Sequence, residues 1–507
     1  MRVVLAAVLL AAGAGAATRA QPAAPAPAAP PAASTVPLAA AVLACPDPVV
    51  GGATTSEVTA VSAGALDGGE VRGQLALDRL QGRGRLQGDA LPGGGTALLE
   101  RRRGELLHAL VPAGTGPVVA RASGLLAPDL AAGQWTRSTS GLEPQGSATG
   151  SSRGTGLAAC SSATTSTWFV GGSGGTGRTA ALYLSDPDPA PAVVDVEVWG
   201  PSGPLDAPAL HDVALAPGGQ RVLRLDAVVP ADRYAVHVVP SQGRVAAALR
   251  TSEASGLQPL GWDWVPAAEA PAERLVVPAV LPGSGTRTLR VVAPGRRSAV
   301  VAVRVVGPDG DVAPDALAAV RVRAGTVTDV DVTSAVSATP SALVVSSDVP
   351  VTASVLERQG AAPGASTRPG ELAYTAAVPP LRAGEVAVVP WVPTGTGRFA
   401  ELTLSATTTA ARVRLTPLGR PGRPAPAASE VDVPSDRTVR VALPTAVGTY
   451  PYAVRVQVLA GSGPVSAGVT LREAGADGPL LAALPLRAVA SSVRVPAVQE
   501  DPGLARG

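Results

Sequence analysis

The chain has 507 residues, with 41 basic residues that are all arginine, 39 acidic residues and a formal net charge of +2. This length allows about three or four domains. Because the acidic and basic residues are interspersed, neither nucleic acid nor an anionic membrane surface is an expected partner. The lack of lysine, asparagine and isoleucine is typical of a GC-rich genome.

The first residues predict export. Met1 and Arg2 precede a short apolar run rich in alanine, which indicates a secretory signal peptide over residues 1–20. The run is shorter than the roughly 20 apolar residues that a membrane helix needs, and an uncleaved membrane anchor is the alternative. Residues 21–44 are rich in proline and alanine, which predicts an extended linker. We therefore expect a secreted, extracytoplasmic protein at the cell surface.

The chain contains two cysteines, Cys45 and Cys160. Each lies just ahead of a Val-Gly-Gly opener, so the two occupy similar places at the starts of successive units. An even count in an exported chain predicts one disulfide between them, worth on the order of 4 to 5 kcal/mol in the chain-entropy description. The alternative is that Val42 to Cys45 is a lipid-attachment box, which would leave Cys160 without a partner.

A repeated pattern occupies the rest of the chain. Three openers each precede a turn of small residues that ends in arginine, and apolar residues then follow at every second position. The openers are Trp168-Phe169-Val170, Val276-Val277-Pro278 and Val388-Val389-Pro390. Alternation between Gly and Pro clusters is the signature of half-buried antiparallel strands, and self-similarity at a fixed spacing indicates a repeat. We expect an all-β fold of tandem immunoglobulin-like or fibronectin-like sandwiches.

The repeat also predicts where the domains begin and end. Residues 45–160 would form a degenerate first β-domain, followed by sandwich repeats over 161–266, 267–375 and 376–498, and a tail over 499–507. Val493 to Val498 repeats an opener with no unit after it. We therefore expect a closing strand that pairs with the preceding repeat and covers its sheet edge.

Several stretches together resemble one protein family. They are TWFVGG after Cys160, the strand and turn VDVEVWGPSG, the segment RVAAALRTSE, the segment GWDWVP and the opener at Val277-Pro278. This set is similar to an actinobacterial family of exported proteins, domain-of-unknown-function family 5719, over most of residues 160–475. The resemblance implies an envelope-associated β protein of a high-GC Gram-positive bacterium. It carries no catalytic residue, because none is assigned for the family.

No set of residues in the sequence converges on a reaction. Gly171 to Gly175 matches G-x-S-x-G, but no helix is predicted after it, as a nucleophile elbow would require. The acidic residues between Asp309 and Asp315 depart from EF-hand spacing and indicate a polar turn. Three histidines have no evident partner for general-base or metal chemistry. They are His108, His211 and His237. We therefore predict no enzymatic activity, no metal and no cofactor.

Tryptophans supply the candidate ligand surface. By strand parity Trp199 faces away from the core, and Trp262 and Trp264 lie in the join between two repeats. Exposed aromatic rings pack well against sugar faces. The alternative is that these rings, together with Trp391, fill seams between sandwiches, because interfaces favour tryptophan.

The sequence thus favours a non-enzymatic structural or interaction protein of the cell envelope, whose partner is an envelope protein or a cell-wall glycan. A glycan-binding module that uses exposed aromatics is the second hypothesis, and a hydrolase is the third. Membrane contact is expected only through an uncleaved N-terminal segment. A pocket that joins His211 or His237 to a carboxylate would favour catalysis.

Overall fold

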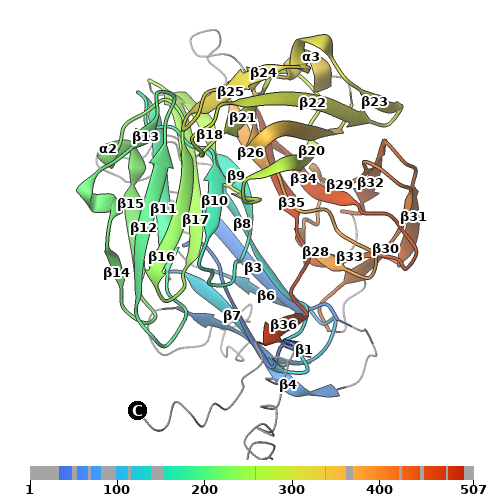
Figure 1. Ribbon diagram of the computed structural model, residues 1–507. Helices are drawn as coiled ribbons and strands as arrows, with labels where there is room; N and C mark the ends of the chain where they lie inside the picture. The colour runs from blue at the N-terminus through green and yellow to red at the C-terminus, as the bar shows by residue number, and fades with distance from the viewer. Residues whose placement is uncertain are drawn as a thin grey trace, which may run out of the picture. The chain divides into compact units, whose positions relative to one another are not determined.

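The computed structural model describes residues 33–47, 54–64, 66, 70–80, 99–111, 116–138, 153–256, 258–336, 339–360, 369–421, 425–445, 450–475 and 478–495. The predicted signal peptide (1–20) and tail (499–507) lie outside these residues. The described chain is dominated by antiparallel strands (Figure 1), which confirms the all-β class. None of its helices has the length and apolar character needed to cross a membrane.

The first sandwich consists of two four-stranded sheets, ordered β2-β7-β4-β5 and β6-β3-β8-β9. Its strands are β2 (Ala40–Ala44), β3 (Thr54–Ser62), β4 (Glu70–Arg79), β5 (Leu99–Arg102), β6 (Leu107–Leu110), β7 (Val118–Gly124), β8 (Leu130–Ser138) and β9 (Gly154–Ala159). Alternate residues such as Leu75 and Val58 bring the two sheets onto one core. That core includes the predicted disulfide between Cys45 and Cys160, which is confirmed. Because β2 lies before residue 45, the linker prediction for residues 21–44 is wrong at its C-terminal end.

The second sandwich, green in Figure 1, packs the sheet β13-β12-β16-β10-β19, with β14 beside β12, against the sheet β15-β11-β17-β18. Its elements are β10 (Thr167–Val170), β11 (Arg178–Ser185), β12 (Ala192–Trp199), β13 (Pro204–Leu205), η1 (Pro208–Leu210), β14 (Val213–Leu215), β15 (Gln220–Arg224), α2 (Leu225–Val228), β16 (Ala235–Gln242), β17 (Ala246–Ser255), β18 (Gln258–Val265) and β19 (Ala267–Ala268). Val194, Val196 and Val198 point into the core, as their alternation predicts.

The third sandwich is built around one long strand that takes part in both of its sheets. The first half of β26 pairs with β20 and β22, and the second half pairs with β21 and β27. Its elements are β20 (Ala272–Val280), β21 (Thr286–Val292), β22 (Ala299–Gly307), β23 (Gly310–Val312), η2 (Asp315–Leu317), β24 (Val320–Val322), β25 (Val327–Asp331), α3 (Thr333–Val336), β26 (Ser341–Gln359) and β27 (Glu371–Ala376). Leu289 on β21 and Val303 on β22 meet in the core between the two sheets.

The fourth sandwich again has two four-stranded sheets, ordered β28-β33-β30-β31 and β32-β29-β34-β35. Its strands are β28 (Val386–Val392), β29 (Arg398–Ala406), β30 (Ala411–Leu418), β31 (Ser429–Val433), β32 (Arg437–Leu443), β33 (Tyr452–Val458), β34 (Ser466–Gly475) and β35 (Gly478–Leu486). Tyr452, Val454 and Val456 alternate along β33 and lie in its core, with Leu402 from the facing sheet. That all the sandwiches are immunoglobulin-like stays a prediction.

The four sandwiches belong to one compact unit, residues 38–491. Strands β9, β18, β27 and β35 come from the four successive sandwiches, and each contacts the next in a cycle that closes from β35 back to β9. β9, β18 and β35 are edge strands of their sheets, and β27 pairs only with β26. Exposed sheet edges invite pairing with other chains. The cycle therefore buries these edges against one another.

The first and fourth sandwiches meet although they are far apart in the sequence. Trp135 and Trp391 stack with ring centroids 4.4 Å apart and an interplanar angle of 7°. The Thr59 Oγ1 hydroxyl donates to the Pro390 carbonyl at 2.6 Å. A Cβ on Gly133 would lie 2.3 Å from Pro390 Cγ, so this position requires glycine. A linear string of repeats would have no contact between its first and last members. The closed cycle therefore depends on all four sandwiches.

A second, small unit contains a two-stranded ribbon of β1 (Ser34–Pro37) and β36 (Ser492–Val495). The strands are antiparallel, and Ser34 pairs with Val495. The closing strand is therefore paired, but its partner is the segment predicted as linker. The expectation that it covers a sheet edge of the preceding repeat is wrong for its described residues.

Candidate functional site

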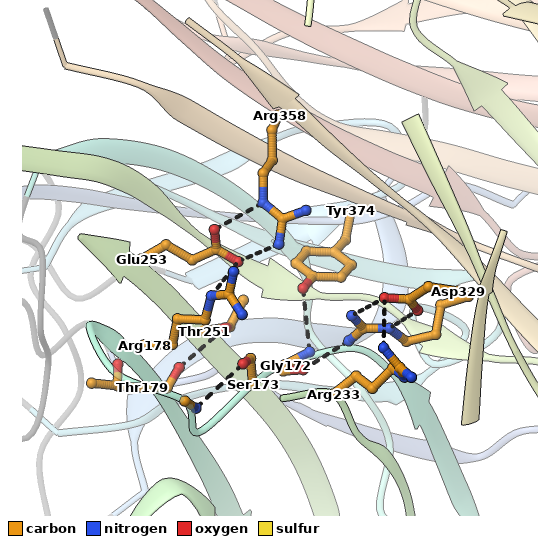
Figure 2. A network of polar contacts seen from close by, with 12 residues as sticks. Gly172, Ser173, Arg178, Thr179, Arg233, Thr251, Glu253, Asp329, Arg358 and Tyr374 are labelled. Carbon is orange, nitrogen blue, oxygen red and sulfur yellow. Dashed lines mark hydrogen bonds and ion pairs between the residues drawn. The ribbon is translucent and has the colours of Figure 1, made fainter. Parts of the chain in front are cut away.

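The glycine-rich turn after β10 lies in the seam between the second and third sandwiches. A Cβ on Gly171 would lie 2.7 Å from Val265 Cγ1 and 2.8 Å from Tyr374 Cε1, which leaves no room for a side chain. Gly172 has a φ of +86°, a conformation that glycine adopts readily. Its amide donates to the Tyr374 hydroxyl at 3.3 Å (Figure 2). The turn is therefore shaped to fit against the third sandwich.

Arg290 on β21 holds this turn from the third sandwich. Its Nη1 donates to the Gly172 carbonyl at 2.7 Å, and its Nε and Nη2 donate to the two carboxylate oxygens of Asp329 at 2.8 and 3.1 Å. Burial lowers the pKa of Arg290, but the nearby Asp329 carboxylate raises it, and the net shift is upward. Arg233 of the second sandwich adds a bond from Nε to the Val327 carbonyl at 3.2 Å. Arg233 Nη1 also lies 4.0 Å from Asp329 Oδ2, so both sandwiches contribute cations around one carboxylate.

A second ion pair lies in the same seam. Glu253 on β17 accepts from Arg358 Nε at 2.8 Å and from Arg358 Nη2 at 2.6 Å, and Figure 2 shows Arg178 on its other side. The Glu253 side chain is only 4% exposed. Burial alone would raise the pKa of Glu253, but the hydrogen bonds and charge of Arg358 hold it below the ordinary value. Paired, buried charges of this kind fix the relative position of two surfaces more than they add stability.

Aromatic rings fill the apolar part of this seam. Trp199 is 8% exposed and stacks on Trp168 with centroids 5.1 Å apart. Val292 and Val327 of the third sandwich pack in the same cluster. The expectation that Trp199 is exposed as a sugar-binding platform is therefore wrong. Alternation correctly places Trp199 on the outer face of its sheet, but the third sandwich covers this part of that face.

The other tryptophans singled out in the sequence are also buried. Trp262 is 0% and Trp264 is 2% exposed, and the two rings pack edge to face in a cluster with Tyr183 and Ala158. Trp391 is 2% exposed in the seam between the first and fourth sandwiches. The rings therefore fill seams, and none of them offers a free face to a ligand.

Buried carboxyl groups lie on strands β18, β26 and β27. The Asp263 carboxylate accepts from the Tyr374 amide at 2.8 Å, and Glu357 accepts from the Leu281 amide at 2.6 Å. Burial raises the pKa of Asp263 and of Glu371 well above ordinary values, and raises the pKa of Glu357 to about 8. These carboxyls satisfy backbone amides at the sheet edges that the cycle buries. No sequence pattern predicted their role, since it depends on contacts between sandwiches.

The G-x-S-x-G match has no geometry of a nucleophile elbow. Ser173 is 2% exposed, and the segment after the turn is strand β11, not a helix. In the acidic turn, Asp311 pairs with Arg304. Among the described residues, no group of three or more His, Cys, Asp and Glu side chains is placed to hold a metal ion. A pocket beside Cys45 has a volume of about 20 Å³, close to that of one water molecule.

Each histidine, in contrast, has a carboxylate partner that sequence reasoning missed. His108 Nε2 lies 3.1 Å from Glu57 Oε2, His211 Nε2 lies 2.6 Å from Asp206 Oδ1, and His237 Nδ1 lies 2.8 Å from Glu197 Oε2. His237 Nε2 also lies 2.8 Å from the Ser166 hydroxyl. The hydrogen bond from Asp206 raises the pKa of His211. Period-two alternation, which places Glu197 on the same face as Trp199, was the available signal, but its meeting with His237 could be predicted only with the strand register known.

The chain matches a known protein family. The family model described as "Family of unknown function (DUF5719)" matches residues 111–444. Neither the curated proteins nor the solved structures contain a match to the chain.

Proposed function

The chain belongs to the DUF5719 family, a family of unknown function, and we propose that it is an exported protein with a structural or interaction role at the cell envelope. In this proposal the principal role is to hold a partner and not to turn over a substrate. The disulfide between Cys45 and Cys160 supports export, because disulfides persist in oxidising compartments outside the cytoplasm. The predicted signal peptide also supports export, and an uncleaved N-terminal anchor is the alternative.

The observation that carries the proposal is the closed cycle of sandwiches. Within residues 38–491, aromatic stacks and buried ion pairs join sandwiches that are neighbours in the sequence and also the first to the fourth. Such contacts fix the spacing of distant surfaces, which is what a scaffold requires. Inter-domain interfaces that are small and wet allow domain motion, whereas these seams contain buried tryptophan and paired arginine.

An envelope protein is a better-supported partner than a cell-wall glycan. The rings of Trp199, Trp262 and Trp264 are at most 8% exposed, so they do not present a flat face to a sugar. Protein partners instead read the arrangement of loops and sheet faces that a rigid body displays. A glycan partner remains an outcome of the test below.

The test uses the full chain in its native cell. Fractionation should place the protein in the envelope with its cysteines oxidised, and crosslinking in the intact envelope should yield a discrete adduct. Arg290→Met, which loosens a seam, should reduce this adduct, whereas Arg304→Met, which breaks an exposed pair, should not. Recovery in the cytoplasm with free thiols would overturn the proposal. Saturable co-sedimentation with purified sacculi, with no protein adduct, would replace the protein partner by a glycan.

A further inference from the structure

The outer sheet face of the second sandwich brings a serine, a histidine and a carboxylate into one row. Ser166 directly precedes β10, His237 lies on β16 and Glu197 lies on β12. In the sheet, β16 lies between β10 and β12, and the register pairs His237 with Trp168 on one side and with Glu197 on the other. Three segments that are distant in the sequence therefore meet at one position of the sheet.

The contacts have the order that activates a hydroxyl nucleophile. Ser166 Oγ is 2.8 Å from His237 Nε2, and Glu197 Oε2 is 2.8 Å from His237 Nδ1. When Nδ1–H donates to the carboxylate, Nε2 is left as the acceptor for the serine proton. A base that is hydrogen-bonded to a serine and oriented by a third group is the pattern of nucleophilic catalysis on unrelated folds.

The imidazole has a rigid support. The His237 ring stacks on Trp168 with centroids 4.1 Å apart and an angle of 11°, and Trp168 in turn stacks on Trp199 in the seam. The His237 side chain is 16% exposed, the Glu197 side chain is 56% exposed, and Ser166 is exposed. Trp168 thus holds the His237 ring in place, while the Ser166 hydroxyl is accessible to solvent.

The sandwich architecture does not require these residues. In the third sandwich, the positions that pair in the same way as Trp168, His237 and Glu197 carry other side chains. They are Val276, Val344 and Arg304. In the fourth sandwich they are Val388, Arg455 and Thr416. Of the three sandwiches compared, only the second has this set of side chains, so the fold does not depend on them. A local functional role explains them better.

We propose that Ser166, His237 and Glu197 form an acyl-transfer site that accepts the acyl group of small activated esters. Ser166 Oγ attacks the ester carbonyl carbon while its proton passes to His237 Nε2. The bond from that carbon to the leaving oxygen breaks, and the leaving alkoxide takes the proton from His237. The products are acyl-Ser166 and the free alcohol, so no oxidant or further reactant is needed. Release of the acyl group as carboxylic acid would use water and the same base.

The expected substrate class follows from the setting of the site. Ser166 lies at the start of a strand on a sheet face, and the side chains of the row are partly exposed. Reactivity should therefore depend on the leaving group more than on the shape of the acyl chain. This reactivity goes beyond the scaffold role and does not depend on it, so either proposal can fail alone.

The experiment treats the full, oxidised chain with a fluorophosphonate probe and with p-nitrophenyl acetate, followed by intact mass and peptide mapping. Wild-type protein should carry one adduct, on Ser166, and Ser166→Ala should lose it. His237→Gln should slow labelling by about 10²-fold or more, in line with the usual contribution of a general base. The matched control is Ser241→Ala, an exposed serine on the same strand as His237, and it should label at the wild-type rate.

Glu197 is a positioning residue, so its test needs a readout that packing alone would not change. Glu197→Gln should slow labelling, and Glu197→Asp, which keeps a carboxylate at this position of the strand, should recover part of the rate. Far-UV circular dichroism of each variant should match wild type, since none of the substituted side chains belongs to the core of the second sandwich. The proposal is overturned if Ser166 carries no adduct, if His237→Gln labels at the wild-type rate, or if adducts form equally on Ser241.

Discussion

Replacing Arg290 by methionine tests whether buried charge holds the second and third sandwiches together. The substitution removes both bonds to Asp329 and the bond to the Gly172 carbonyl. The Asp329 carboxylate then keeps only Arg233, whose Nη1 lies 4.0 Å from Oδ2. Removal of one partner from a buried ion pair typically costs about 3–5 kcal/mol. The Asp329 side chain is 26% exposed, so water can partly solvate it. We therefore expect the lower end, a loss of about 3 kcal/mol in the free energy of unfolding.

The control variant is Arg304→Met in the same sandwich. Its partner is Asp311, and the two side chains are 32% and 38% exposed, so solvent screens the pair. Exposed pairs contribute about 1 kcal/mol or less. Equilibrium unfolding in urea should be followed by tryptophan fluorescence, because Trp168 and Trp199 lie in the seam next to Arg290 and report its opening. If Arg290→Met were no more destabilising than Arg304→Met, the idea of a charge-held seam would be refuted.

Three further outcomes are expected. The pKa of Glu357 is about 8 when folded and near 4.5 when unfolded, so its stabilising contribution is complete below about pH 4.5 and is lost as pH rises to about 8. Glu357→Gln should flatten the fall in unfolding free energy over that window, and an unchanged slope would contradict this. Gly133→Ala should destabilise by about 1–3 kcal/mol in thermal unfolding through overpacking, whereas Gly295→Ala, which has open space, should be neutral. Reduction of Cys45–Cys160 should lower urea stability by about 4 kcal/mol, and equal midpoints with and without reductant would count against it.

Local pattern predicted the strand faces well. The inward positions of Val194, Val196 and Val198 follow from period-two alternation alone and are confirmed. The solvent exposure of Trp199 did not follow, because parity assigns a side chain to a face but does not say what covers that face. Its cover comes from Val292, which belongs to another sandwich.

The contacts between sandwiches could not be predicted from the sequence. Nothing near Trp135 indicates that its ring stacks on Trp391, since this contact depends on how the whole cycle closes. The row at His237 was closer to prediction, because period-two alternation places Glu197 on the same face as Trp199. The register of two strands was the missing information, and it is set by pairing between distant segments.

The ribbon of β1 and β36 has a mechanical consequence. Because Ser34 pairs with Val495 and Pro37 pairs with Ser492, the chain enters and leaves the ribbon at the same end. Tension between the two flanking segments would therefore load one residue pair at a time and open the ribbon like a zipper. Two-stranded ribbons are only marginally stable, so this one should yield at low force. Under tension the ribbon would therefore open, and the chain would lengthen, before any sandwich unfolds.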